Sequence, residues 1–132
     1  MKIYASTANL ADVRDFVAEH ANRFGFSDRE VSNIRLAVDE ACTNIIKHAY
    51  DFDENQTVVI TVSFEGNQIR ISLLDHGLAF NPDTYSKPDL QKQMIKKKRG
   101  GVGVYLIRKL MDEVIYMKTK NGNEIRMYKK RS

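Results

Sequence analysis

The segment from Ser27 to Ala49 constrains the fold most, because it has the pattern of one long amphipathic helix. Its first residues, SDRE, form a capping box in which Ser27 and Glu30 satisfy each other's free backbone donors. Apolar residues then recur at helical spacing and predict one face packed on a core; they are Ile34, Ala37, Val38, Ala41, Ile45 and Ala49.

Polar side chains border the apolar stripe of this helix. Glu40, Asn44 and His48 stand at positions i, i+4 and i+8, which stacks a carboxylate, an amide and an imidazole in one column. Such a column needs a partner. It is either a polar edge satisfied by the protein's own loops or one wall of a binding site.

The flanking sequence predicts strands and two further helices. Residues 57–64 and 69–74 alternate apolar and polar side chains, which indicates a β-hairpin with one buried face. One helix runs from Asn9 to Gly25, and another restarts at GGVGV. Short strands are predicted at 2–6, 115–119 and 124–128. This order predicts an α+β fold: a two-layer sandwich of a mostly antiparallel mixed sheet with helices on one face.

Length and composition restrict the class of protein. The 132 residues are about one domain long. No apolar run approaches the roughly 20 residues of a membrane span and no charged-then-apolar leader opens the sequence, so we expect a cytoplasmic protein. The lone cysteine, Cys42, on the apolar side of the long helix, fits a reduced compartment. The three scattered histidines do not suggest a transition-metal site.

The formal net charge of +4, from 21 basic and 17 acidic residues, is a mild excess. Part of it lies in the run from Lys92 to Arg99. Aromatic residues are not interleaved with that run, so a stacking platform is absent and a nucleic-acid-binding domain is disfavoured.

Three features follow the predicted hairpin. DHGLAF places Asp75 at a strand end and Gly77 where the backbone can approach a flat ligand; a carboxylate suits an exocyclic amine such as that of adenine, although a plain capped turn has the same pattern. The long, weakly patterned segment from His76 to Arg99 indicates a functional lid. RGGVGV then places glycines at a helix start, which favours phosphate, although glycines also occur in plain loops.

In this order the motifs resemble the N, G1 and G2 boxes of the GHKL ATPase superfamily, the Bergerat ATP-binding fold, and are most similar to its bacterial anti-sigma factor serine kinases. The resemblance covers LAVDEACTNIIKHAY, DHGLAFNP, GGVGVYLIRKLMDEV and the closing GNEIRM. It implies that residues 1–132 form a single GHKL-type ATP-binding kinase domain with an ATP lid at about 76–100. We expect this lid to be mobile until nucleotide binds.

The resemblance also implies roles for individual residues. It assigns Asn44 to the Mg²⁺ that bridges the ATP phosphates, Asp75 to the adenine amino group and Glu40 to general base catalysis. His48 lies near the phosphates or caps the helix end. The remaining ATP contacts that it implies are Gly77, Ala79, Arg99, Gly100, Gly101, Val102, Gly103 and Val104.

Two positions depart from the family's pattern. Ala79 stands where many members have a second glycine in the adenine loop, and Asn123 stands where the closing motif often carries threonine. Neither departure removes a catalytic group. They bear on how tightly adenine is held and on any water-mediated contact that the threonine would make.

The resemblance implies an ATP-dependent anti-sigma factor and protein serine kinase that phosphorylates an anti-sigma-factor antagonist and sequesters a sigma factor or an equivalent regulator. Homodimerisation is a further possibility, while direct nucleic-acid or membrane binding is not expected. Two alternatives remain open. One is the ATPase domain of a histidine kinase, disfavoured because the ATP domain uses all 132 residues. The other is a non-catalytic, nucleotide-gated interaction module in which Glu40 is a structural cap.

Overall fold

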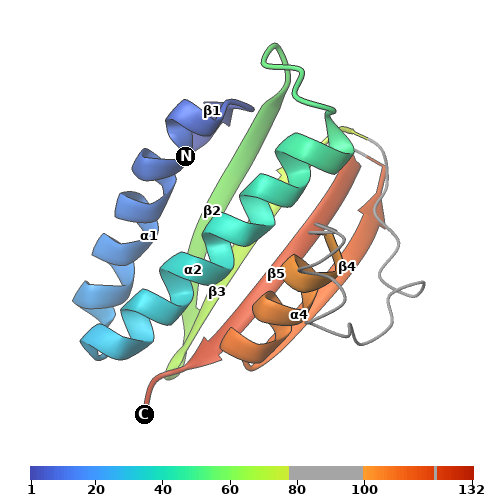
Figure 1. The fold of residues 1–132 in the computed structure, drawn as a ribbon. Helices are drawn as coiled ribbons and strands as arrows, with labels where there is room; N and C mark the ends of the chain where they lie inside the picture. The colour runs from blue at the N-terminus through green and yellow to red at the C-terminus, as the bar shows by residue number, and fades with distance from the viewer. Residues whose placement is uncertain (78–99, 121) are drawn as a thin grey trace.

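The computed structural model of the chain describes residues 1–77, 100–120 and 122–132 (Figure 1). Its strands and α-helices are β1 Lys2–Tyr4, α1 Leu10–Phe24, α2 Asp28–Asn44, β2 Thr57–Glu65, β3 Gln68–Asp75, α4 Gly100–Leu110, β4 Glu113–Thr119 and β5 Gly122–Lys130. A 3-10 turn, Thr7–Asn9, precedes α1, and a π-helical turn, Ile45–Ala49, follows α2. The predicted lid falls almost wholly on residues 78–99 and lies outside the described part of the chain.

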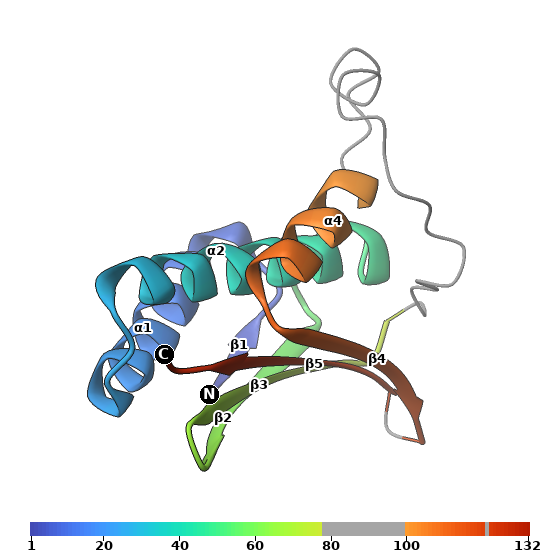
Figure 2. The same cartoon turned by 90° about the horizontal axis from the view of Figure 1, so that it is seen from below.

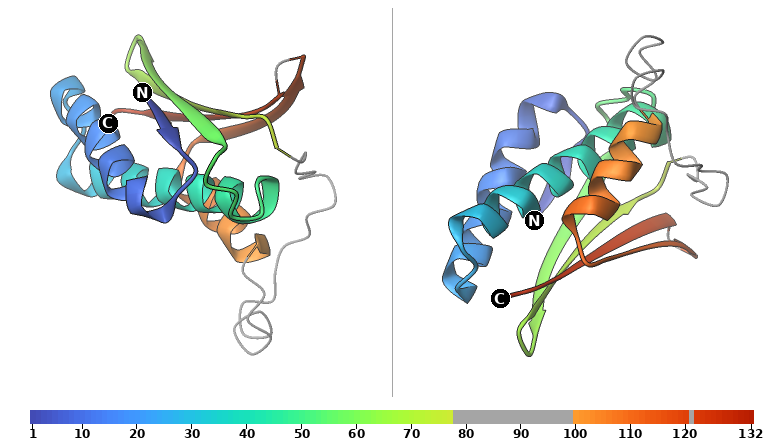
Figure 3. Two further views of the ribbon diagram at one scale, coloured as in Figure 1. Left: turned by 90° about the horizontal axis from the view of Figure 1, so that it is seen from above. Right: turned by 60° about the horizontal axis from the view of Figure 1, so that its bottom comes forward.

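The five strands form one sheet in the order β1-β2-β3-β5-β4. Helices α1, α2 and α4 cover one face of this sheet (Figures 2 and 3). The predicted two-layer α+β fold is confirmed, and every strand pair within the described ranges is antiparallel. No helix in those ranges has the length and apolar character needed to cross a membrane.

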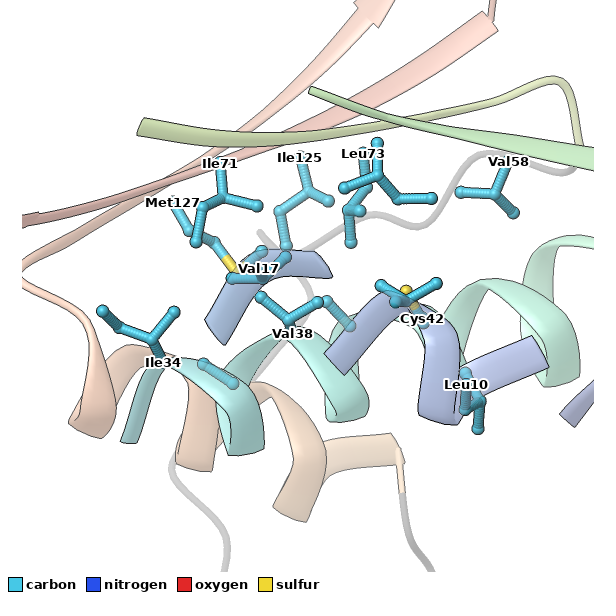
Figure 4. Close-up of a cluster of buried hydrophobic side chains, with 14 of the residues drawn as sticks. Leu10, Val17, Ile34, Val38, Cys42, Val58, Ile71, Leu73, Ile125 and Met127 are labelled. Carbon is cyan, nitrogen blue, oxygen red and sulfur yellow. The ribbon is translucent and has the colours of Figure 1, made fainter. Parts of the chain in front are cut away.

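The core lies between the sheet and the inner faces of the helices (Figure 4). The predicted apolar stripe is confirmed, since Ile34 and Val38 are fully buried and face Ile71 and Leu73 of β3. Cys42 shares this interior, and burial raises the pKa of its thiol to about 12. The thiol therefore stays protonated and behaves as a small apolar side chain.

Local sequence signals set the helix ends between α1 and α2. Gly25 ends α1 with a left-handed φ of 97°, a conformation that glycine adopts without strain. The Ser27 N–H donates to Glu30 Oε1 over 2.9 Å, and the Glu30 N–H donates to Ser27 Oγ over 3.2 Å. The predicted capping box is thus confirmed.

The other end of the long helix differs from the prediction of a continuous α-helix to Ala49. α2 ends at Asn44, and in the π turn that follows, the Tyr50 N–H donates to the Ile45 carbonyl over 3.0 Å. Each hydrogen bond of a π turn spans one residue more than in an α-helix. His48 lies in this π turn and is exposed to solvent, whereas Asn44 is half-buried.

Candidate functional site

Three segments that the sequence singled out lie at the same end of the fold. The last turn of α2, the end of β3 and the first turn of α4 lie there together (Figures 1 and 3). α4 packs against α2. The fold therefore gathers Asn44, Asp75 and the glycines of α4, although they are far apart in the sequence.

Asp75 is the last residue of β3 and is only 5% exposed. Its Oδ1 accepts hydrogen bonds from the Gly77 N–H over 3.0 Å and from Asn123 Nδ2 over 3.1 Å. No donor among the described residues reaches Oδ2. Because buried polar atoms are normally paired, this second oxygen is suited to receive a donor from a ligand.

Asn123, which the sequence marked only as a departure, belongs to this site. Its Nδ2 also donates to the Gly77 carbonyl over 3.0 Å. The register of β3 and β5 places Asn123 directly opposite Asp75. The contact between Asn123 and Asp75 could have been predicted only from the pairing of β3 with β5. No local sequence motif encodes that pairing.

Tyr50, which sequence reasoning missed, ties the same region together. Tyr50 is a buried residue, and its hydroxyl donates to the Thr57 carbonyl over 2.7 Å and accepts from the His76 N–H over 2.6 Å. It thereby joins the end of the π turn to the start of β2 and the end of β3. Burial, with a smaller contribution from the charge of Asp75, raises the pKa of Tyr50, so the hydroxyl remains a donor.

Replacing Tyr50 by phenylalanine is expected to lower the free energy of unfolding by about 1–3 kcal/mol, because the substitution leaves the His76 N–H and the Thr57 carbonyl without their partner. Chemical denaturation measures this difference. The matched control is Tyr4→Phe, since Tyr4 is 63% exposed and its hydroxyl has no hydrogen bond within the described ranges. Equal stability of the two variants would contradict the role assigned to Tyr50.

Gly77 is required by a contact that the sequence did not predict. A Cβ at this position would lie 2.2 Å from the Ala49 carbonyl oxygen and 2.8 Å from Tyr50 Cδ1. Real Cβ atoms do not approach backbone this closely. The expected approach of Gly77 to a ligand stays a prediction, whereas the close approach that the structure shows is to the π turn.

Glu40 and Asn44 lie one α-helical turn apart on α2, and both are half-buried. Neither side chain has a hydrogen-bond partner within the described ranges. The neighbouring Asp39 differs, because it forms a 2.7 Å ion pair with Arg14 of α1. The carboxylate of Asp39 therefore holds two helices together, whereas no described residue occupies that of Glu40.

The glycine-rich segment forms the first turn of α4, from Gly100 to Gly103. The first backbone N–H groups of an α-helix have no partner within the helix and favour an anion. Val104 is fully buried, so its side chain packs in the interior and only its backbone is suited to bind a ligand. Ala79 and Arg99, the other predicted ATP contacts, lie outside the described residues.

Known proteins share this sequence pattern. A family described as "Histidine kinase-like ATPase domain" matches residues 3–129. Two similar proteins are both named serine-protein kinase RsbW, from Bacillus thuringiensis (strain Al Hakam) and Bacillus mycoides (strain KBAB4). They are 33% and 34% identical to this chain over 121 residues, which cover 89% of this chain and 75% of each relative.

Solved structures share the fold. The RsbU and RsbW domains of Rv1364c from Mycobacterium tuberculosis match 99% of this chain with a TM-score of 0.65 and 17% identity; the match spans 32% of that protein's length. The catalytic domain of histidine kinase ThkA matches 99% of this chain and 96% of its own, with a TM-score of 0.57 and 15% identity. These structures support the fold, and the sequence matches establish that the chain belongs to the histidine kinase-like ATPase domain family, in the branch of the serine-protein kinase RsbW.

Proposed function

We propose that this protein is an ATP-dependent protein serine kinase whose active site lies at the end of the fold that holds the last turn of α2, the end of β3 and the first turn of α4. The observation that carries the proposal is the buried carboxylate of Asp75, which keeps one oxygen without a donor in the described structure. The amino group of adenine supplies such a donor. The names of the curated relatives support transfer to serine.

The phosphates would lie between α2 and the first turn of α4, whose free N–H groups suit their negative charge. Asn44 fits a magnesium site, because its half-buried amide is unpaired among the described residues and Mg²⁺ needs few protein oxygens. When bound with ATP, Mg²⁺ would neutralise charge on the phosphates. Asn44 and the helix start would thus orient the γ-phosphate toward Glu40.

Glu40 would act as the general base. Its carboxylate would accept the proton of a substrate serine hydroxyl while the serine oxygen bonds to the γ-phosphorus and the bond from that phosphorus to the β-phosphate oxygen breaks. The products would be phosphoserine and ADP. The position of Glu40 one turn before Asn44 would bring base and phosphate to the same side of α2.

The protein substrate in this proposal is an anti-sigma-factor antagonist, and the second partner is a sigma factor or an equivalent regulator. Binding of the two would be mutually exclusive and selected by nucleotide and phosphorylation state. The chain would act in the cytoplasm, and two copies would associate as a homodimer. The similarity to RsbW kinases supports this class of partner.

The histidine kinase alternative is supported by the shared fold of ThkA. The two proposals differ in the chemistry of the product, because phosphoserine survives acid whereas phosphohistidine is hydrolysed. Acid treatment of the labelled product therefore separates them, and an acid-labile product would contradict the serine kinase.

Calorimetric titration with ATP, with and without Mg²⁺, tests the proposed site. We expect magnesium-dependent binding that Asn44→Ala weakens roughly 10- to 100-fold, as for loss of a contact to a charged group. Asn33→Ala is the matched control, because Asn33 is also half-buried on α2 but lies three turns before Asn44. Absence of ATP binding by the unaltered protein would overturn the proposed function.

A further inference from the structure

We propose that Asn123 is a positioning residue that makes this site selective for a base with an exocyclic amino group. The inference rests on the proposed function, since it takes ATP as the ligand of Asp75. The inference goes beyond that function because it assigns the selectivity for the base to Asn123. This side chain would act by orienting Asp75 and would not contact the phosphates.

The hydrogen bonds of Asn123 determine the orientation of its amide. Both acceptors that it faces, Asp75 Oδ1 at 3.1 Å and the Gly77 carbonyl at 3.0 Å, require a donor. Only the –NH₂ group has two N–H donors, so a flipped amide would place its oxygen against two other oxygens. Asn123 is therefore held in one orientation by the end of β3.

This contact is built by a close approach of two strands. Gly122, at the start of β5, has a φ of 140°, and a Cβ there would lie 2.0 Å from the Asp75 carbonyl oxygen. Glycine lets β5 begin directly against the end of β3. The next residue, Asn123, is consequently brought opposite Asp75 in the strand register.

The two oxygens of the Asp75 carboxylate therefore have different surroundings. Oδ1 of Asp75 is occupied by the Gly77 N–H and by Asn123, so rotation of the carboxylate would break both hydrogen bonds. Since no donor among the described residues reaches Oδ2, this oxygen is the acceptor that we assign to the base. The Gly77 carbonyl is also occupied and does not compete for the same donor.

This arrangement predicts selectivity by the group at position 6 of a purine. An amino group donates to Oδ2, whereas a hydrogen atom gives no hydrogen bond and an oxo group places an oxygen against the carboxylate. A threonine at position 123 would have a single hydroxyl donor, and would leave either Asp75 or the Gly77 carbonyl without its partner. The asparagine satisfies both.

The test compares ATP with purine riboside triphosphate, which has the same sugar and phosphates but no amino group. Titrations use the unaltered protein, Asn123→Ala, Asn123→Thr and the control Asn67→Ala. Asn67 lies in the turn at the opposite end of β3, where its amide contacts the Arg131 carbonyl. Melting temperatures establish that each variant is folded.

We expect the unaltered protein and Asn67→Ala to prefer ATP about 10- to 100-fold. Asn123→Ala should reduce that preference to within a few-fold by weakening ATP alone, and Asn123→Thr should be intermediate. Equal weakening of both nucleotides by Asn123→Ala, or no change in either, would overturn the inference. Should the alanine variant not fold, the threonine variant decides by the same ratio.

Failure of the two proposals is distinguishable. If the unaltered protein binds neither nucleotide, the ATP site is wrong and the role of Asn123 falls with it. If it binds ATP with Mg²⁺ but Asn123→Thr and Asn123→Ala keep the full preference for the amino group, the ATP site stands and only the positioning role is rejected.

Discussion

Replacing Glu40 by glutamine is expected to reduce phosphoryl transfer to a purified antagonist protein by about 10²- to 10⁴-fold, the usual contribution of a general base. Glutamine keeps the shape of the side chain but cannot take up the proton of the attacking hydroxyl. ATP affinity should change little, because the proposed contacts to the base and the phosphates belong to other residues. Single-turnover transfer of labelled phosphate and ATP calorimetry measure the two quantities.

The adjacent carboxylate provides a matched control for Glu40. Asp39→Asn removes the same charge one residue earlier, but Asp39 is paired with Arg14 over 2.7 Å. That pair is partly exposed, so its loss should cost at most about 1 kcal/mol of stability and leave the transfer rate nearly unchanged. Transfer at the unaltered rate in Glu40→Gln would reject the base role and favour the non-catalytic, nucleotide-gated module.

Replacing Gly77 by alanine is expected to abolish detectable ATP binding and to lower the free energy of unfolding by about 1–3 kcal/mol, as for overpacking of a filled site. The added methyl group would lie 2.2 Å from the Ala49 carbonyl oxygen, so the end of β3 or the π turn must move. Such a shift would displace the hydrogen bonds that Gly77 makes with Asp75 and Asn123. One methyl group is too small to fill a nucleotide site by itself, so the expected loss of ATP binding is due to this displacement.

Gly66→Ala is the control for this variant. A Cβ at Gly66 meets nothing within 4 Å, but its φ of 59° is unfavourable for alanine. It should therefore lose stability through backbone strain while binding ATP normally. Calorimetry and chemical denaturation of both variants separate the two effects. Normal ATP affinity in Gly77→Ala would contradict the contact between this glycine and the π turn.

Much of the fold follows from signals that span a few residues. The capping box at Ser27 and Glu30, the apolar stripe of α2 and the hairpin of β2 and β3 were all predicted and are all present. Each depends on neighbours within about one or two turns or on alternate strand positions, which the sequence displays directly. The position of Asp75 at a strand end was predicted for the same reason.

The candidate site was predicted less completely. Glu40 and Asn44 lie on α2 as expected, whereas the helix changes to a π turn before His48, which is exposed to solvent. The turn that results makes a close contact with Gly77, nearly thirty residues later. No local pattern of apolar residues indicates such a contact, so the sequence predicted a continuous α-helix past Asn44.

The sequence by itself determined the helices, the strands, the buried faces and the family, because periodicity, caps and motifs are local properties of the chain. Only the tertiary structure decided that Asn123 and Tyr50 hold the loop of Asp75. The Asn123 contact depends on the pairing of β3 with β5, and the Tyr50 contact depends on the packing of the π turn against the ends of two strands. Both join residues that become neighbours only when the sheet and its helices pack together.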